Sequence, residues 1–93
     1  MTDPEFTHVL FYEYVADILE RRGPYRDEHL RRIEALRAAD RLIVAGAVGD
    51  PPTGGVIGFK GLTREEVEAW ADTDPYTTAG LVVSRRVEPW RLV

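Results

Sequence analysis

The segment FTHVLFYEYV, residues 6–15, constrains the fold of this chain more than any other part of the sequence. Its β-branched and aromatic residues predict a β-strand. Because side chains alternate across a strand, Leu10 and Tyr12 fall on one face while Val9 and Phe11 fall on the other. Both faces are therefore apolar. A strand of this kind has to be covered on both sides, which predicts a central position in the sheet.

The rest of the chain alternates between helical and extended patterns. After a possible short helical turn, the chain breaks at Gly23 and Pro24. A turn, GDPPTGG, separates two apolar runs, and Thr63 with Glu66 has the spacing of a capping box. The predicted elements are a helix at about 25–40, strands at 42–48 and 56–61, a capped helix after Thr63 and a last strand at 80–90.

This order, βαββαβ, predicts an α+β fold of ferredoxin-like type, with two helices over one face of a four-stranded antiparallel sheet. The other face of the sheet would then be an unusually large exposed apolar patch for a monomer. We therefore expect a homodimer in which the sheets pack against each other. Trp90, at the end of the last strand, is expected to be buried near the subunit contact or against a helix.

Length and charge limit the possible functions. A chain of 93 residues is expected to form one domain, residues 1–93. With 12 basic and 16 acidic residues its formal net charge is −4, which disfavours nucleic acid and anionic membranes as partners. The N-terminal apolar run is too short and polar to span a bilayer and follows no basic segment, so we predict a soluble cytoplasmic protein.

Cysteine is absent, which excludes disulfides, cysteine nucleophiles and thiolate zinc sites. The remaining metal ligands are His8, His29 and carboxylates, without the close spacing of a metal motif, so no metal site is predicted. His8 can either point into a pocket or lie near an exposed strand end, and the strand end is the favoured interpretation. The turn GDPPTGG lacks the following Lys and Ser or Thr of a phosphate loop.

Two residues stand out as candidates for chemistry. His29 lies on the apolar stripe of the first long helix together with Ile33 and Leu36, where a hydrocarbon side chain is expected. A half-buried imidazole needs partners for both ring nitrogens, and the partner of a core histidine is usually a structural hydrogen bond. A carboxylate partner would also make the ring more basic.

The second candidate is Asp74, in the segment DTDPYTTAGLV. Asp74 as N-cap, Pro75 at the first helical position and Gly80 as terminator explain one short turn of helix, under which Tyr76 would pack. Local capping is thus a sufficient reason for these residues, and a functional role for the carboxylate stays open at this point.

Several motifs, in their order and spacing, resemble the YciI-like (YCII-related) family over nearly the whole chain. They are YRDEHL at 25–30, LIVAGAV at 42–48, DPYTTAGL at 74–81 and VEPW at 87–90. The resemblance implies a ferredoxin-like subunit that forms a dimeric α+β barrel. It also implies that His29 and Asp74 form an acid–base pair in a pocket, with Arg26 and Tyr76 binding substrate. The family often has proline after the glycine of the second strand, where this chain has Ala47.

What the resemblance implies for function is a small enzyme without cofactor or metal, of lyase (dehydrochlorinase) or isomerase type. Asp74 would orient His29, and Arg26 would hold the charge of an anionic or phenolic substrate by a forked hydrogen bond. Two alternatives stay open. Arg26 can be an ordinary ion-pairing residue of the helix surface, and the protein can be a non-catalytic dimeric small-molecule-binding or accessory protein.

Overall fold

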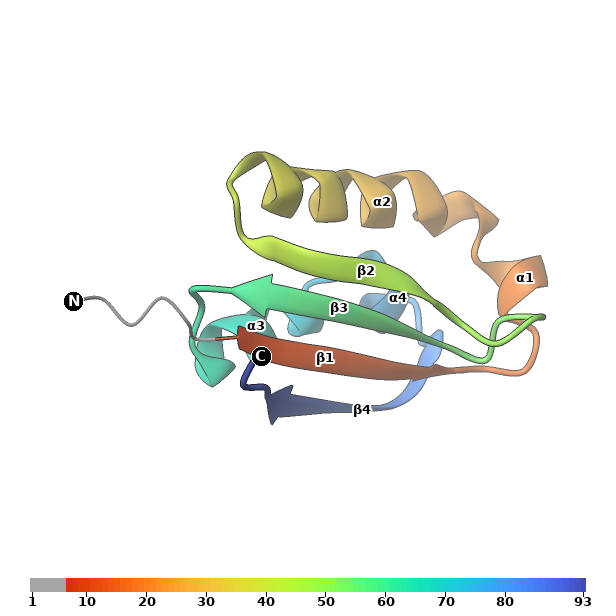
Figure 1. Cartoon of the computed structure of the whole chain (residues 1–93). Coiled ribbons are helices and arrows are strands. Elements are labelled where there is room, and N and C mark those ends of the chain that lie inside the picture. Colours follow the sequence, from red (N-terminus) through yellow and green to blue (C-terminus); the bar gives the residue numbers. More distant parts are fainter. Residues whose placement is uncertain (1–6) are drawn as a thin grey trace.

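A computed structural model describes residues 7–93 of the chain (Figure 1). The strands are β1 (Thr7–Tyr14), β2 (Leu42–Val48), β3 (Gly54–Lys60) and β4 (Val82–Pro89). The helices are α1 (Ile18–Arg21), α2 (Gly23–Ala38), α3 (Arg64–Asp72) and α4 (Pro75–Thr78). The predicted order of strands and long helices is confirmed, although Phe6, the first residue of the predicted strand, lies outside the described residues.

The four strands form one sheet in the order β2-β3-β1-β4, and all neighbouring strands are antiparallel. β1 pairs with β3 on one side and β4 on the other, so its predicted central position is confirmed. This topology is ferredoxin-like. The α+β fold class predicted from the order of the elements is therefore correct.

The helices pack on one face of the sheet, where they form the main hydrophobic core. Leu10 and Phe59 from the strands are fully buried there, as is Val67 of α3, and Ile33 of α2 is nearly so. A second, smaller cluster closes the end of the core beside α4. It consists of Ile18, Tyr76 and Leu81. This smaller cluster holds α4 against the start of α1, so that the Asp-Pro-aromatic turn has a defined position.

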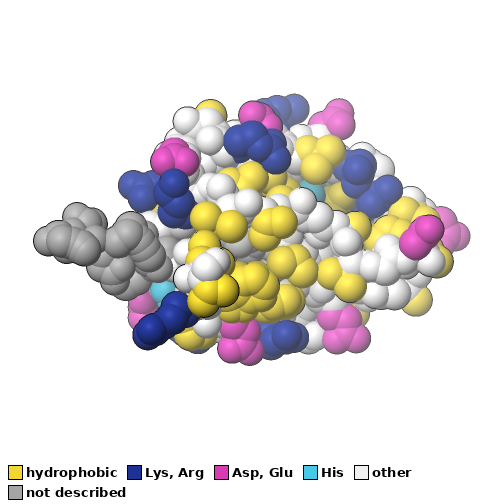
Figure 2. All heavy atoms as spheres, in the orientation of Figure 1, with side chains coloured by type: hydrophobic (Ala, Val, Ile, Leu, Met, Phe, Trp, Pro, Cys, Tyr) yellow, Lys and Arg dark blue, Asp and Glu magenta, His cyan; other side chains and the backbone are white. Residues whose placement is uncertain are grey.

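Hydrophobic side chains also gather on the opposite face of the sheet, which Figure 2 shows. Phe11 lies there opposite Val56 of β3, and its neighbours on the edge strand include Val44 and Val48, which are 46% and 45% exposed. Trp90 packs at 6.3 Å from the Phe11 ring and is itself 46% exposed. The expectation that a helix buries Trp90 is wrong, because the chain leaves β4 on the open face of the sheet; burial at a subunit contact stays a prediction.

Several element boundaries differ from the sequence prediction by one or two residues, and two of these differences have a clear physical reason. α2 begins at Gly23, so Pro24 lies inside its first turn instead of before it. This is tolerated because the first N–H groups of a helix have no intrahelical partner to lose. β3 begins at Gly54, two residues earlier than predicted, because Gly54 pairs with Glu13 of β1.

The two glycines at the start of β3 permit a very close approach of neighbouring groups. A Cβ atom on Gly54 would lie 2.3 Å from the carbonyl oxygen of Tyr12, and one on Gly55 would lie 2.4 Å from the hydroxyl of Tyr14. The Tyr14 side chain therefore lies directly over the backbone of β3. This placement matters for the site described below.

Both predicted caps are present. Thr63 Oγ1 accepts from the backbone N–H of Glu66 at 3.1 Å, and Glu66 Oε1 accepts from the N–H of Thr63 at 2.8 Å, which completes the capping box of α3. Asp74 is the N-cap of α4, and Gly80 follows that helix with a φ of 76°.

Across residues 7–93, the helices are too short or too polar to cross a bilayer.

Candidate functional site

His29 in the middle of α2 meets Asp74 at the start of α4, although 45 residues separate them in the sequence. The Nδ1 atom of His29 lies 2.9 Å from Oδ1 and 3.0 Å from Oδ2 of Asp74. His29 is 5% exposed and Asp74 is fully buried. Because a carboxylate can only accept hydrogen bonds, Nδ1 carries the proton, and Nε2 of the neutral ring is the acceptor.

The carboxylate of Asp74 has two further donors. The Tyr12 hydroxyl donates to Oδ2 at 2.7 Å, and the backbone N–H of Tyr76 donates to Oδ1 at 3.3 Å. Asp74 thus caps α4 and binds His29 with the same side chain. A fully buried carboxylate is tolerated only when several donors satisfy its oxygens, and here they do.

Tyr12 is a site residue that the sequence does not reveal. Its place on the predicted first strand indicates a core residue, and in the structure it is indeed buried, 4% exposed. The missed signal is chemical: the hydroxyl of a buried tyrosine usually has a hydrogen-bond partner. The sequence does not show that this partner is Asp74, 62 residues away.

One face of the His29 ring is covered by Tyr76. The two rings stack at 3.8 Å between centroids with an interplanar angle of 6°. Tyr76 is 2% exposed, and its buried hydroxyl has no hydrogen-bond partner within residues 7–93. The contact fixes the plane of the imidazole, because Nδ1 is held by Asp74 and the ring face is held by Tyr76.

The His29 Nε2 atom has no partner in the described part of the chain.

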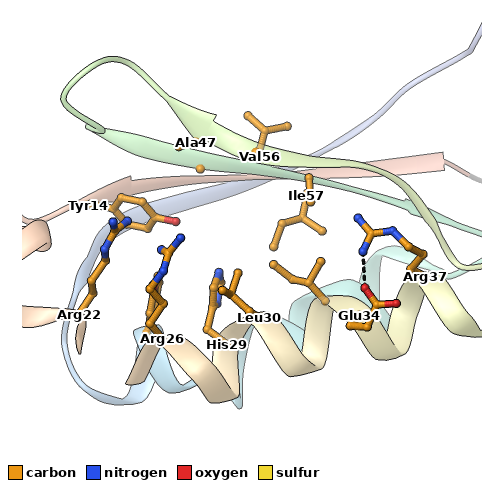
Figure 3. A pocket seen from close by; sticks show the side chains of 15 residues that line it. Tyr14, Arg22, Arg26, His29, Leu30, Glu34, Arg37, Ala47, Val56 and Ile57 are labelled. Atoms are coloured by element: carbon orange, nitrogen blue, oxygen red, sulfur yellow. Dashed lines mark hydrogen bonds and ion pairs between the residues drawn. The ribbon is translucent and has the colours of Figure 1, made fainter. Parts of the chain in front are cut away.

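A pocket of about 420 Å³ lies between α2 and the strands β2 and β3, and we call it the α2 pocket (Figure 3). His29 lines it, whereas Asp74 lies behind the imidazole and does not. Arg26 also lines the pocket, as the family resemblance implied, and forms no ion pair within residues 7–93. Tyr76 lines the pocket as well, and the hydroxyl of its ring is buried. The volume is that of a site for a small organic molecule.

His8 does not line the α2 pocket. Its Nδ1 atom lies 2.9 Å from the carbonyl oxygen of Leu62, near the first residues of β1. The interpretation of His8 as a strand-end residue is therefore the correct one. Among residues 7–93, no three His, Asp or Glu side chains are grouped so that they could hold a metal ion.

Comparisons with known proteins assign the chain to a family. The family model of the YCII-related domain matches residues 6–91. The chain belongs to this YCII-related family. Protein YciI of Escherichia coli is 36% identical over 92% of this chain and 97% of its own length. An uncharacterized protein of Haemophilus influenzae is 34% identical over the same shares of the two chains.

Two solved structures resemble this YCII-related chain. The 5-chloro-2-hydroxyhydroquinone dehydrochlorinase of Burkholderia phenoliruptrix, in complex with 2,5-dihydroxybenzoquinone, has a TM-score of 0.77 and 25% identity, covering 91% of this chain and 93% of its own. A proposed antibiotic biosynthesis monooxygenase of Nitrosomonas europaea has a TM-score of 0.60 at 15% identity, covering 97% and 92% of the two chains. The second likeness shows the fold alone.

Two tyrosines beside the His29–Asp74 pair of this YCII-related protein have perturbed acidity. Burial raises the pKa of Tyr12 well above its ordinary value of 10.0, and the negative charge of Asp74 adds to the effect. Burial also raises the pKa of Tyr14, where the nearby Tyr76 and Asp74 act in the same direction and Arg22 and Arg26 oppose them. Both phenols therefore remain neutral hydrogen-bonding groups throughout the physiological pH range.

These shifts predict that alkali destabilises the folded chain. Below the ordinary tyrosine pKa of 10.0, the folded and unfolded states hold the same phenol protons. Above it the unfolded chain loses its protons while folded Tyr12 keeps its own, so the free energy of unfolding falls by up to about 1.4 kcal/mol per pH unit for this residue. We expect urea unfolding at increasing alkaline pH to show this decline and Tyr12→Phe to show a shallower one. If the free energy of unfolding fell equally steeply with pH in wild type and Tyr12→Phe, the raised pKa of Tyr12 would not be the cause of the decline.

Proposed function

We propose that this chain is a small-molecule enzyme of lyase or isomerase type, in which His29 transfers a proton through Nε2. One observation carries the proposal. The buried carboxylate of Asp74 holds Nδ1 of His29. The ring of His29 lines the α2 pocket, and its Nε2 atom has no partner in residues 7–93. An imidazole held in this way by a carboxylate is suited to general acid–base catalysis near neutral pH. The likeness to a dehydrochlorinase supports the same class of reaction.

In the proposed reaction, neutral His29 accepts a proton from a hydroxyl or an activated carbon of the substrate. In a lyase, the electron pair left behind forms a new double bond, and the leaving group departs with its bonding electrons. In an isomerase, the protonated ring returns the proton to another carbon. Asp74 stabilises the imidazolium ion in both cases, Arg26 binds the negative charge of the substrate, and Tyr76 supports the ring plane.

The second function considered is a small-molecule-binding protein without turnover. One observation favours it: Asp74 caps α4 and accepts from three groups, so the pair would be kept for stability alone. The two functions differ in whether His29 changes its protonation state during a cycle. A binding protein needs the pocket and no proton transfer.

We further propose that the chain acts as a homodimer in which a second copy covers the open face of the sheet. The apolar side chains of Phe11, Val56 and Val44 on that face support this proposal. The resemblance to the YCII-related family, which implies a dimeric α+β barrel, supports it too. The cytoplasmic location and the single-domain organisation of residues 1–93 stay predictions from the sequence.

A turnover screen tests the enzymatic proposal. Wild-type protein is incubated with chlorinated hydroxyquinones and with unsaturated lactones, and chloride release and changes in the ultraviolet spectrum are recorded. We expect catalysed elimination or double-bond migration with at least one compound. Incorporation of deuterium from deuterated water at the reacting carbon would identify the proton transfer. Compounds that bind saturably without any conversion would favour the binding protein.

A further inference from the structure

Two arginines at the start of α2 line the α2 pocket without a counterion. Arg22 is the N-cap of α2 and Arg26 follows one turn later; both are half-buried. Figure 3 shows both side chains extending from the helix towards the sheet, beside Tyr14. Neither guanidinium forms an ion pair or hydrogen bond with another residue of the described chain. At the far end of the pocket, by contrast, Arg37 is paired with Glu34.

This arrangement is electrostatically unfavourable in the protein alone. Like charges four residues apart on a helix repel each other. The N-terminus of a helix is also the positive end of its dipole, which disfavours cations there. The first turn of α2 contains no acidic residue that would compensate. A bound anion between Arg22 and Arg26 would relieve both penalties.

The rest of the pocket limits the ligand's chemistry. Ile33 and Ile57 form an apolar wall, and the unpartnered Nε2 of His29 lies on the same stripe of α2. Arg26 and Arg22 precede His29 by three and seven residues, which corresponds to about 4.5 and 10.5 Å along the helix axis. That span fits an anionic group attached to a six-membered ring.

From these observations we infer that the α2 pocket binds a small planar organic acid, whose carboxylate is held by Arg22 and Arg26 and whose ring lies beside His29. This inference rests on the proposed function for the reacting end of the ligand and adds Arg22 as a residue that selects the substrate. Guanidinium groups match the planar fork of a carboxylate, which gives both affinity and orientation.

A phosphate ester fits this position less well. Phosphate sites at helix N-termini depend on free backbone N–H groups. Here Pro24 has no N–H, and the N–H of Tyr25 donates to the carbonyl oxygen of Arg22 at 2.9 Å. The two side chains are therefore the main donors that the helix start offers to an anion.

Binding of benzoate and of its neutral counterpart benzamide tests the inference, with dissociation constants taken from NMR titrations. The proteins are wild type, Arg22→Gln and the control Arg31→Gln, which removes an exposed arginine that pairs with Glu28 and does not line the pocket. We expect wild type to bind benzoate roughly 10-fold more tightly than benzamide. Arg22→Gln should remove most of this difference, and Arg31→Gln should preserve it.

Thermal unfolding shows whether the variant remains folded. Because Arg22→Gln removes a like-charge repulsion, its midpoint should be equal to or above that of wild type. Equal affinities of wild type for the two probes, no benzoate binding in the millimolar range, or the same change in both variants would overturn the inference. So would displacement of benzoate by an equal concentration of inorganic phosphate. Benzoate selectivity without turnover of any compound would leave the inference standing while the proposed enzyme fails.

Discussion

Replacing His29 by glutamine is expected to lower kcat for the substrate found in the screen by a factor of about 10² to 10⁴, which is the usual contribution of a general acid–base residue. Glutamine is similar in size to histidine and can still bond to Asp74, but its amide accepts no proton at neutral pH. The binding of substrate should change much less than kcat. Steady-state kinetics of wild type and His29→Gln would measure both quantities.

Asp74→Asn is expected to lower kcat by a similar factor while the fold persists. Asparagine is as good an N-cap as aspartate, so the start of α4 keeps its cap. It carries no charge to stabilise protonated His29, and its amide can hold the ring in the wrong tautomer. Asp72→Asn is the matched control, because Asp72 is exposed, pairs with Arg85 and does not line the α2 pocket.

Wild-type rates in both His29→Gln and Asp74→Asn would contradict the catalytic role of the pair. Loss of rate in His29→Gln alone would leave His29 as the proton-transfer residue and reduce Asp74 to a capping residue. Weaker substrate binding with unchanged kcat in both variants would favour the binding protein instead. Circular dichroism of each variant separates these outcomes from loss of the fold.

Phe11→Glu is expected to convert the protein from a dimer into a monomer. Light scattering of wild type at micromolar concentration should give twice the 10.5 kDa of one chain, and the variant should give the mass of one chain. Phe11 lies on the open face of the sheet and packs against Trp90 and Arg86 of its own chain. Arg86 is already paired with Glu88, and a carboxylate placed between two apolar sheets loses its water, which costs several kcal/mol.

Leu19→Glu serves as the control for this experiment. Leu19 is an apolar residue of α1 that is 50% exposed, comparable to Trp90, but it lies away from the open face of the sheet. The control should remain a dimer. A monomeric wild type would contradict the proposed dimer, and a dimeric Phe11→Glu would place the subunit contact on another surface.

The order of the elements and their caps could be predicted from the sequence because they depend on local chemistry. The alternation in residues 6–15 identified a central strand, and Thr63 with Glu66 marked the start of α3. The stripe of His29, Ile33 and Leu36 gave the buried face of α2. The start of β3 was predicted two residues too late. The pairing of Gly54 with Glu13 joins two distant segments, and the residues around Gly54 do not indicate it.

The composition of the site was decided by the tertiary structure. Local rules explain Asp74 as a cap and His29 as a core residue, and neither rule states that the two meet; the family resemblance alone implied that they do. Tyr12 is part of the site only because the face of β1 that carries it lies beneath α4. Nothing in the sequence distinguishes Arg22 from the other arginines, and only the fold places it beside Arg26 at the α2 pocket. Sequence patterns record what a residue does within its own helix or strand, whereas the distance between two elements depends on how the whole core packs.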